Sequence, residues 1–456
     1  MVKKQYPLPE ARDTFEPLKG VKSVLEALKD RVRASTDILI VAVDIGKFRN
    51  CACFMISNGK VLAGKYFFPN TAKGFEWFLN KAGFYKNRNH CRDIIFGMEP
   101  SGQYWKHLYQ FLTLRGEFTV TVSPLAVNRN RETMNVSKDK SDPKDTRNIA
   151  DLIMQGKFYF PVQRDKTVAQ LHRFMQLYFR SINAKSTLRN RLRNVVGYVF
   201  PELEKYFYDI EAKTMLIILE KYPLPSMITH IPKDQFVKNV AKSNPHFSHK
   251  RLEEIYDMAK NSVGIVGEDE AVLFEISTLL QDLGILYSRI AQVNERVHKI
   301  VKDLRDYRLL LTLPGVGPIT AASIIAEIGD IQHFTSGRQL IKLAGLDLWS
   351  EESGTSVHTL KHITKRGRKL LRIIMYQAAV RAIRRGSPIR KFYLRIITNQ
   401  PEKKKKKKKA LIAVACKLLR IIFRMLTEEI PYDGDYDSKL QVRYKTANWY
   451  INSSLT

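Results

Sequence analysis

The chain has 456 residues, the length of about three ordinary domains, and 44% of them are apolar, which excludes a generically disordered protein. It carries 76 lysines and arginines against 45 aspartates and glutamates, and the formal charge of +31 attracts polyanions. Nucleic acid is therefore the first partner to consider, although the same charge also suits mere solubility or a ribosome-associated scaffold.

The sequence shows no membrane or export signal. No stretch of about 18 uncharged apolar residues occurs, and the first 20 residues lack the apolar centre of a signal peptide. We expect a cytoplasmic protein with no membrane contact. The four cysteines lack the spacing of a metal site, and we expect them to be reduced and structural.

Short apolar and β-branched runs fill the segment that begins at Asp37. Three of them follow one another, DILIVAVDIG, CACFMIS and KVLAGKYFF, and two more, DIIFGMEPSG and FTVTVSP, alternate with helix-like stretches. This pattern predicts an α/β sheet domain that ends between residues 160 and 165.

Two long stretches with helical spacing follow the sheet domain. Residues 168–200 form a basic amphipathic pattern, and residues 272–304 have an apolar side chain every three or four positions. The second pattern predicts a coiled coil, which we interpret as a contact between subunits. A helical hairpin within one chain has the same pattern and is the alternative. The apolar stripe consists of Val272, Ile276, Leu279, Leu283, Leu286, Ile290, Val293, Val297, Ile300 and Leu304.

A Gly-x-Gly turn precedes an apolar helix in LPGVGPITAASIIAEIGDI and resembles the turn of a helix-hairpin-helix. Backbone N–H groups at Gly315 and Gly317, with the N-terminus of the following helix, can bind a DNA phosphate. An ordinary turn between helices has the same signature. Farther along, seven consecutive lysines at residues 403–409 precede another apolar helix, and we expect this run to be a flexible polyanion-binding loop.

These patterns together predict a multidomain α/β plus α protein. Its expected parts are an N-terminal extension, a sheet domain, a coiled-coil helical middle and a mostly helical C-terminal domain, at residues 1–36, 37–165, 166–308 and 309–456.

Four acidic residues have positions suited to metal-assisted phosphodiester chemistry. Asp44 ends the first predicted strand and Glu99 the fourth, while Asp142 and Asp145 lie three residues apart at a helix start. Such chemistry needs several carboxylates around one or two Mg²⁺ or Mn²⁺ ions. Each residue alone also suits a cap or a solvated turn, and Asp142 in particular suits a cap of the helix that Pro143 opens.

The order of these acids is that of RNase H-like, RuvC-like nuclease domains. The segments VAVDIGKFRN, MEPSGQYW and KSDPKDTRNIADLI resemble the acidic elements of the DEDD-type transposases of bacterial insertion sequences. Downstream, LPGVGPITAASIIAEIGDI, KLAGLDLWSEESG, ITKRGRKLLR and ALIAVACKLLRIIF resemble segments of the C-terminal transposase domain of that family, in the same order. The resemblance covers nearly the whole chain except about the first 35 residues.

The resemblance assigns a serine nucleophile to the C-terminal domain. In the family this serine follows an Ala-Gly-Leu element and precedes a glycine, and the matching residue is Ser353. Leu348 stands where a proline is common and Glu352 where a second serine is common. Ser350 and Ser356 therefore stay open as alternatives.

Basic residues in two segments are candidates for nucleic-acid binding. Near the serine they suit either charge balance at the scissile phosphate or general backbone binding, and in the long basic helix they suit a folded RNA. The candidates are Lys365, Arg366, Arg368, Arg189, Arg191 and Arg193.

The resemblance implies a DNA recombinase with a covalent serine–DNA intermediate. In our hypothesis the metal-binding carboxylates of one subunit act with Ser353 of another, and the phosphoserine link conserves the energy needed for rejoining. The resemblance further implies double-stranded donor and target DNA, a structured guide (bridge) RNA that pairs with both, and a nucleoid-associated location in a bacterial or archaeal cell. Strand exchange needs at least two active sites, so we expect a homo-oligomer, with dimer and tetramer both open.

Two other functions fit parts of the sequence. A RuvC-like nuclease or junction resolvase would use the carboxylates without a covalent intermediate. A noncatalytic nucleic-acid scaffold would use the basic residues alone, with the acids as helix caps.

Overall fold

The structure is a computed structural model that describes residues 19–134, 142–161, 165–265, 269–349, 352–353, 357–358, 362–398 and 403–434. Contacts divide the chain into two compact units, residues 1–163 and 164–456, called here the N-terminal and C-terminal units. Each unit is described by itself.

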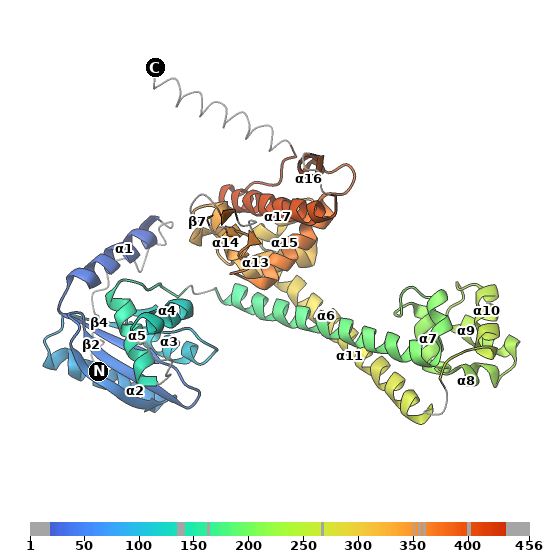
Figure 1. Cartoon of the computed structure of the whole chain (residues 1–456), viewed down its shortest axis with the longest axis horizontal. Helices are drawn as coiled ribbons and strands as arrows, with labels where there is room; N and C mark the ends of the chain where they lie inside the picture. Colours follow the sequence, from blue (N-terminus) through green and yellow to red (C-terminus); the bar gives the residue numbers. More distant parts are fainter. Residues whose placement is uncertain are drawn as a thin grey trace, which may run out of the picture. The chain divides into compact units, whose positions relative to one another are not determined.

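A five-stranded mixed sheet forms the centre of the N-terminal unit (Figure 1). The strand order is β3-β2-β1-β4-β5; β1 pairs with β2 and β2 with β3 in antiparallel fashion, whereas β1–β4 and β4–β5 are parallel. All five predicted strands are confirmed. They are β1 (Ile38–Asp44), β2 (Arg49–Ile56), β3 (Val61–Pro69), β4 (Asp93–Met98) and β5 (Thr119–Thr121).

Helices cover both faces of this sheet, because alternate residues of the buried strand β1 point to opposite sides. Ile40 and Ala42 belong to one apolar core together with Ile149 of α5, whereas Val41 and Val43 belong to a second core. The helices are α1 (Lys19–Ala34), α2 (Ala72–Arg88), α3 (Trp105–Leu114), α4 (Pro124–Met134) and α5 (Asp142–Met154).

Two long helices cross the C-terminal unit, α6 (Lys166–Val199) and α11 (Asp269–Val301) (Figure 1). They are antiparallel, since Leu171 shares a core with Val297, and Val196 shares another with Ile276. The apolar stripe predicted over residues 272–304 faces α6 of the same chain. Our interpretation of this stripe as a subunit contact is therefore wrong, because most of its side chains are already buried within the chain.

The length and apolar composition of α11 also match those of a membrane-spanning helix. Within the described residues, Glu270–Val301 is the one helix long and apolar enough to cross a membrane. Its apolar stripe packs against α6, as expected for a core helix of a folded protein.

A small helical subdomain closes one end of the α6–α11 pair (Figure 1). Its core includes Phe236, Leu252 and Ile255 together with the adjacent ends of the long helices. Its elements are η1 (Pro201–Lys205), α7 (Lys213–Lys221), α8 (Pro225–Thr229), α9 (Lys233–Ser243) and α10 (His249–Lys260).

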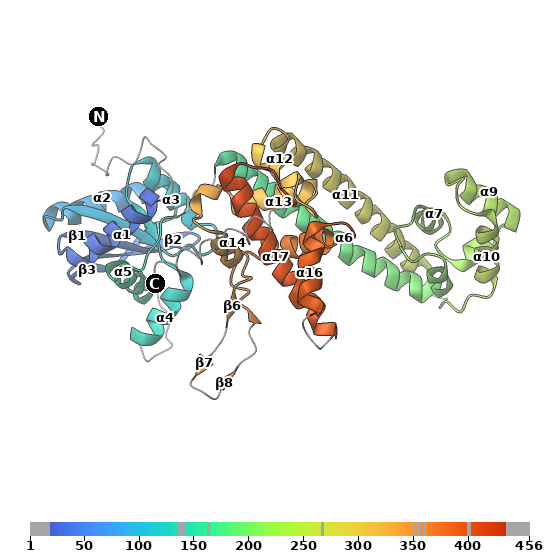
Figure 2. The ribbon, with the colours of Figure 1, turned by 90° about the horizontal axis from the view of Figure 1, so that it is seen from above.

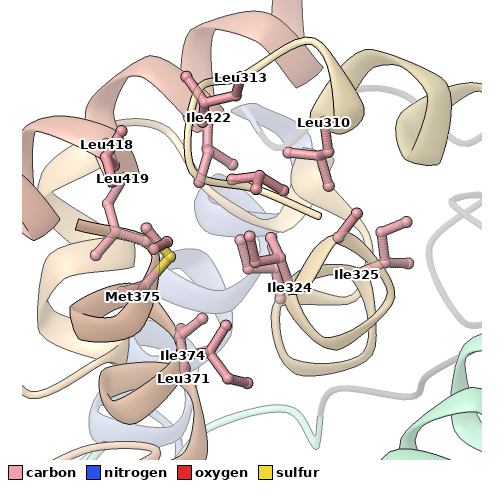
Figure 3. Close-up of a cluster of buried hydrophobic side chains, with 14 of the residues drawn as sticks. Leu310, Leu313, Ile324, Ile325, Leu371, Ile374, Met375, Leu418, Leu419 and Ile422 are labelled. Carbon is pink, nitrogen blue, oxygen red and sulfur yellow. The ribbon is translucent and has the colours of Figure 1, made fainter. Parts of the chain in front are cut away.

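The opposite end of the pair joins the C-terminal helices in one core. Figure 3 shows Leu310, Ile324, Met375 and Leu418 of four different helices converging there. The expected helical middle and C-terminal domain thus share apolar packing. The helices are α12 (Arg305–Leu311), α13 (Pro318–Ile328), η2 (Ile331–His333), α14 (Gly337–Leu343), α15 (Lys369–Ala382), α16 (Pro388–Thr398) and α17 (Lys403–Glu428).

The lysine run at residues 403–409 is helical, so our expectation of a flexible loop is wrong. These residues form the first turns of α17, whose later part buries Val414 and Leu418. Lysine is a good helix former, and a helix anchored by packing extends at little cost per added residue.

Candidate active site

Asp44 and Glu99 lie at the ends of two neighbouring parallel strands. The register of β1 and β4 pairs Val43 with Met98, so the two acids follow directly after paired residues. Both side chains are half-buried. Asp44 continues the alternation of Ile40 and Ala42, which places it on the sheet face that α5 covers.

Helix α5 brings Asp145 over this face of the sheet. Ile153 lies directly on Gly97 of β4, where a larger residue would collide with it. Asp145 is 6% exposed, and its Oδ1 lies 2.7 Å from Nη2 of Arg131 in α4. The contact is an ion pair without hydrogen-bond alignment, because Oδ1 accepts no hydrogen bond from the described residues.

Helix α5 also buries polar side chains that the sequence analysis did not select. They are Thr146, Asn148 and Asp151, and none of them is more than 7% exposed. Burial raises the pKa of Asp151, and Arg147 opposes this effect. The signal in the sequence is an aspartate between Ile149 and Leu152, on the apolar side of the helix.

Cys53 of β2 lies near this buried acid. Burial raises the pKa of the Cys53 thiol to about 11, and the negative charge of Asp151 contributes further. The thiol is protonated at neutral pH and is a poor nucleophile. This agrees with the structural role expected for the cysteines.

The fourth predicted acid, Asp142, begins α5, but its side chain lies outside the described residues. Among the side chains that are described, no three histidines, cysteines, aspartates or glutamates form a group that could hold a metal ion. The structure therefore brings Asp44 and Glu99 together at adjacent strand ends, while Asp145 is paired with Arg131.

The chemistry of these donors fits a hard divalent cation. Carboxylate oxygens are the ligands that Mg²⁺ and Mn²⁺ prefer. The Asp145 oxygen next to Arg131 has no aligned hydrogen bond among the described residues, so its neighbour there is the positive charge of Arg131.

Ser353 lies on a short strand of the C-terminal unit, between α14 and α15 (Figure 2). Two antiparallel strand pairs form this segment, and the pair that contains Ser353 lies within the other along the chain. Ser353 pairs with Val357. The strands are β6 (Leu348–Trp349), β7 (Glu352–Ser353), β8 (Val357–His358) and β9 (His362–Ile363). The side chain of Ser353 and the whole of Ser350 and Ser356 lie outside the described residues.

Where these strand pairs join the helices, the backbone at Gly345 lies close to the backbone at Lys365. Gly345 has a φ of +64°, and a Cβ there would lie 2.8 Å from the carbonyl carbon of Lys365. Thr364 donates a hydrogen bond of 2.6 Å to Asp347, and Arg372 donates one of 2.8 Å to the Ala344 carbonyl. These contacts fix where the serine segment leaves and rejoins the helical core.

The three basic residues after the serine segment have different surroundings. Lys365 and Arg366 are exposed, as a phosphate-binding residue must be. Arg368 is partly buried and donates a hydrogen bond to the main-chain carbonyl of Glu327. That bond ties the start of α15 to the end of α13.

The glycine turn before α13 is tightly packed on one side only. Gly315 has a φ of +87°, and a Cβ there would lie 2.7 Å from the Ala382 nitrogen of α15 and still closer to the Ala378 carbonyl oxygen. Gly317 caps α13 and has open space around it. Gly315 thus has a packing role, and Gly317 has room for a ligand.

The predicted basic helix is confirmed as α6, and its three candidate arginines differ in exposure. Arg191 is exposed, and Arg189 is half-buried. Arg193 donates a hydrogen bond of 3.0 Å to the Tyr208 carbonyl. Arg193 therefore holds the helical subdomain against α6.

Comparison with known protein families gives two matches. Residues 41–201 match the DEDD transposase domain of IS110, and residues 307–394 match the Transposase IS116/IS110/IS902 family. The first match contains Asp44, Glu99, Asp142 and Asp145, and the second contains Ser353.

Relatives extend over nearly the whole chain. The transposase for insertion sequence element IS1111A of Coxiella burnetii is 24% identical over 423 residues, which cover 90% of this chain and 95% of that protein. The insertion element IS116 uncharacterized 44.8 kDa protein of Streptomyces clavuligerus is 22% identical over 86% of this chain and 96% of its own length.

A shorter match is closer in sequence. The pilin gene-inverting protein of Moraxella bovis is 34% identical over 148 residues, which cover 32% of this chain and 45% of that protein. The two family matches, together with the relatives that extend over nearly the whole chain, show that this chain is a DNA transposase of the DEDD-type insertion-sequence family.

Proposed function

We propose that this transposase cuts and rejoins DNA through a transient bond between Ser353 and the cut strand, with metal-binding carboxylates in the N-terminal unit. The observation that carries the proposal is the placement of Asp44 and Glu99 at adjacent parallel strand ends, in a chain whose second family match contains Ser353.

The N-terminal unit is proposed to be an RNase H-like, RuvC-like domain. Support comes from the strand order β3-β2-β1-β4-β5, in which three antiparallel strands are followed by two parallel ones. The acids then lie at the carboxyl ends of the central strands, with α5 packed beside them.

Asp44, Glu99, Asp142 and Asp145 are the residues that would hold Mg²⁺ or Mn²⁺. Such an ion, when bound, supplies Lewis acidity and charge neutralisation at a phosphate. The carboxylates would hold the ion beside the carboxyl ends of β1 and β4. The half-buried setting of Asp44 and Glu99 limits competing water.

Ser353 is the proposed nucleophile. Its Oγ forms a bond to the scissile phosphorus and passes its proton to a base, while the ester oxygen of one DNA strand leaves and gains a proton. In the second step a hydroxyl of the new strand attacks the same phosphorus, and Ser353 leaves. One phosphodiester is lost and one is gained, so no ATP is needed.

The remaining basic side chains suit the DNA and a structured guide RNA. Lys365 and Arg366 are exposed beside the serine segment and can balance phosphate charge, and Arg191 is exposed on α6. The net charge of +31 supports binding of more than one nucleic-acid chain. We place this activity in the cytoplasm, on the nucleoid, in a dimer or tetramer.

One relative supports rejoining as well as cutting. The Moraxella bovis relative is named a pilin gene-inverting protein. An inverted DNA segment is joined again at both ends, which a simple nuclease does not do.

The test uses labelled donor and target DNA, the RNA flanking the element, and Mg²⁺. We expect the wild-type protein to give recombined DNA and a protein–DNA adduct on a denaturing gel. Ser353→Ala abolishes both, whereas Ser350→Ala and Ser356→Ala, the matched controls, keep them. Asp44→Asn or EDTA lowers the cleavage rate by at least about 10³-fold, as expected for loss of charge stabilisation at a transition state.

Other outcomes select other functions. Released strands without an adduct, unchanged in Ser353→Ala, would identify a plain metal-dependent nuclease. Activity that survives both Asp44→Asn and EDTA would contradict the metal chemistry. Equal recombination after complete RNA removal would contradict the guide RNA.

A further inference from the structure

The ion pair between Arg131 and Asp145 involves an acid that the proposed function places in the metal site. Arg131 comes from α4 and Asp145 from α5, and the two helices pack together through Val127 and Ile149 in the same apolar core. The side chains are 20% and 8% exposed, respectively. The arginine is therefore held in place by the fold.

The positive charge of Arg131 lies beside the buried carboxyl group of Asp145. An ionised carboxylate away from water is strongly unfavourable unless a cation is near, and Arg131 is 2.7 Å from its Oδ1. A divalent cation satisfies the same requirement. Arg131 and the metal ion thus serve the same carboxylate.

The geometry of the contact also suggests that Arg131 can be displaced from Asp145. Neither Asp145 Oδ1 nor Arg131 Nε makes a hydrogen bond within the part of the chain that the structure describes. A well-aligned fork between arginine and carboxylate would be difficult to displace, whereas a pair held mainly by charge is easier to exchange.

We propose that Arg131 is the resident counter-cation of Asp145, and that a divalent cation binds this carboxylate only by displacing Arg131. The inference rests on the proposed metal role of Asp145. Its consequence is that Arg131 sets the metal affinity of the site. In the absence of metal, Arg131 keeps α5 folded on the sheet. Because Arg131 competes with the metal ion for Asp145, it also weakens metal binding.

The first test measures Mn²⁺ binding to the full-length protein by isothermal titration calorimetry. Arg131→Gln removes the competing charge, and we expect Mn²⁺ to bind at least about tenfold more tightly than to the wild type. The matched control is Lys144→Gln, which removes an exposed positive charge adjacent to Asp145 in the sequence. We expect less than about a twofold change there, because an exposed charge is screened by solvent.

The second test measures thermal unfolding, which stays informative even if Arg131→Gln is unstable. Without metal this variant should unfold several degrees below the wild type, since a buried carboxylate has lost its partner. Mn²⁺ should raise its Tm by more than it raises that of the wild type. Arg131→Gln/Asp145→Asn, which has neither charge, should recover most of the lost stability and gain little from Mn²⁺.

The outcomes separate this inference from the proposed function. If the Asp44→Asn and Asp145→Asn variants each bind Mn²⁺ as tightly as the wild type does, the proposed metal site itself is wrong. If both substitutions weaken binding but Arg131→Gln binds Mn²⁺ no more tightly than the wild type, the metal site stands and the displacement of Arg131 is wrong.

Discussion

Gly315 and Gly317 lie two residues apart in one turn, and their surroundings are opposite. Gly315 has a positive φ and is in contact with the backbone of α15, so it is required by packing. Gly317 has an ordinary φ of −99° and nothing near its missing side chain. At the scale of single residues, the first glycine serves the fold and the second is available to a phosphate.

We predict that Gly315→Ala lowers the free energy of unfolding by roughly 2–4 kcal/mol, because it adds both a steric clash and backbone strain. Gly317→Ala, the matched control, should change it by less than about 1 kcal/mol. Urea unfolding followed by circular dichroism measures both. Equal losses for the two variants would contradict the packing role of Gly315.

The nucleic-acid candidates divide in the same way. Arg193 and Arg368 bind main-chain carbonyl groups of their own chain, whereas Lys365, Arg366 and Arg191 are exposed. Residue type and neighbouring sequence do not distinguish the two groups. The distinction depends on which carbonyl the fold places within range of each guanidinium.

At the scale of elements, the positive charges at the lysine-rich start of α17 destabilise the helical state of this segment. Lysines four residues apart repel one another, and positive charge at a helix N-terminus opposes the helix dipole. The apolar part of α17, which packs in the C-terminal core, holds the segment helical. A bound polyanion would remove both penalties.

We predict that replacing all seven lysines at residues 403–409 with glutamine weakens the salt dependence of DNA binding. Each lysine that neutralises a phosphate adds about 0.9 to the slope of log K against log salt, so the slope should fall by up to roughly 6. Fluorescence anisotropy of a labelled duplex over a range of NaCl concentrations measures it. Seven arginines instead should keep the slope, and an unchanged slope in the glutamine variant would show that the segment does not contact DNA.

At the scale of the whole molecule, the acidic residues and Ser353 belong to separate compact units of the chain. A substitution of an acidic residue therefore leaves Ser353 intact, and a substitution of Ser353 leaves the acidic residues intact. This separation makes it possible to test whether the two groups act from different subunits.

We predict that Asp44→Asn and Ser353→Ala chains, each inactive alone, form a protein–DNA adduct when mixed. The adduct should be on the Asp44→Asn chain, which retains Ser353, while the Ser353→Ala chain supplies the carboxylates. A size tag on one chain identifies the carrier on a denaturing gel. No adduct in the mixture, from chains that each bind DNA normally, would show that both groups must come from one subunit.

The sequence by itself determined the five strands, the two long helices and the positions of Asp44 and Glu99, because local periodicity and strand ends are encoded by neighbouring residues. It could not determine that the apolar stripe of α11 packs on α6, since the same spacing suits a partner in the chain or in another subunit. Nor could it reveal the pairing of Arg131 with Asp145, or the helical state of the lysine run. Those features depend on contacts between segments far apart in the chain, and only the tertiary structure decides them.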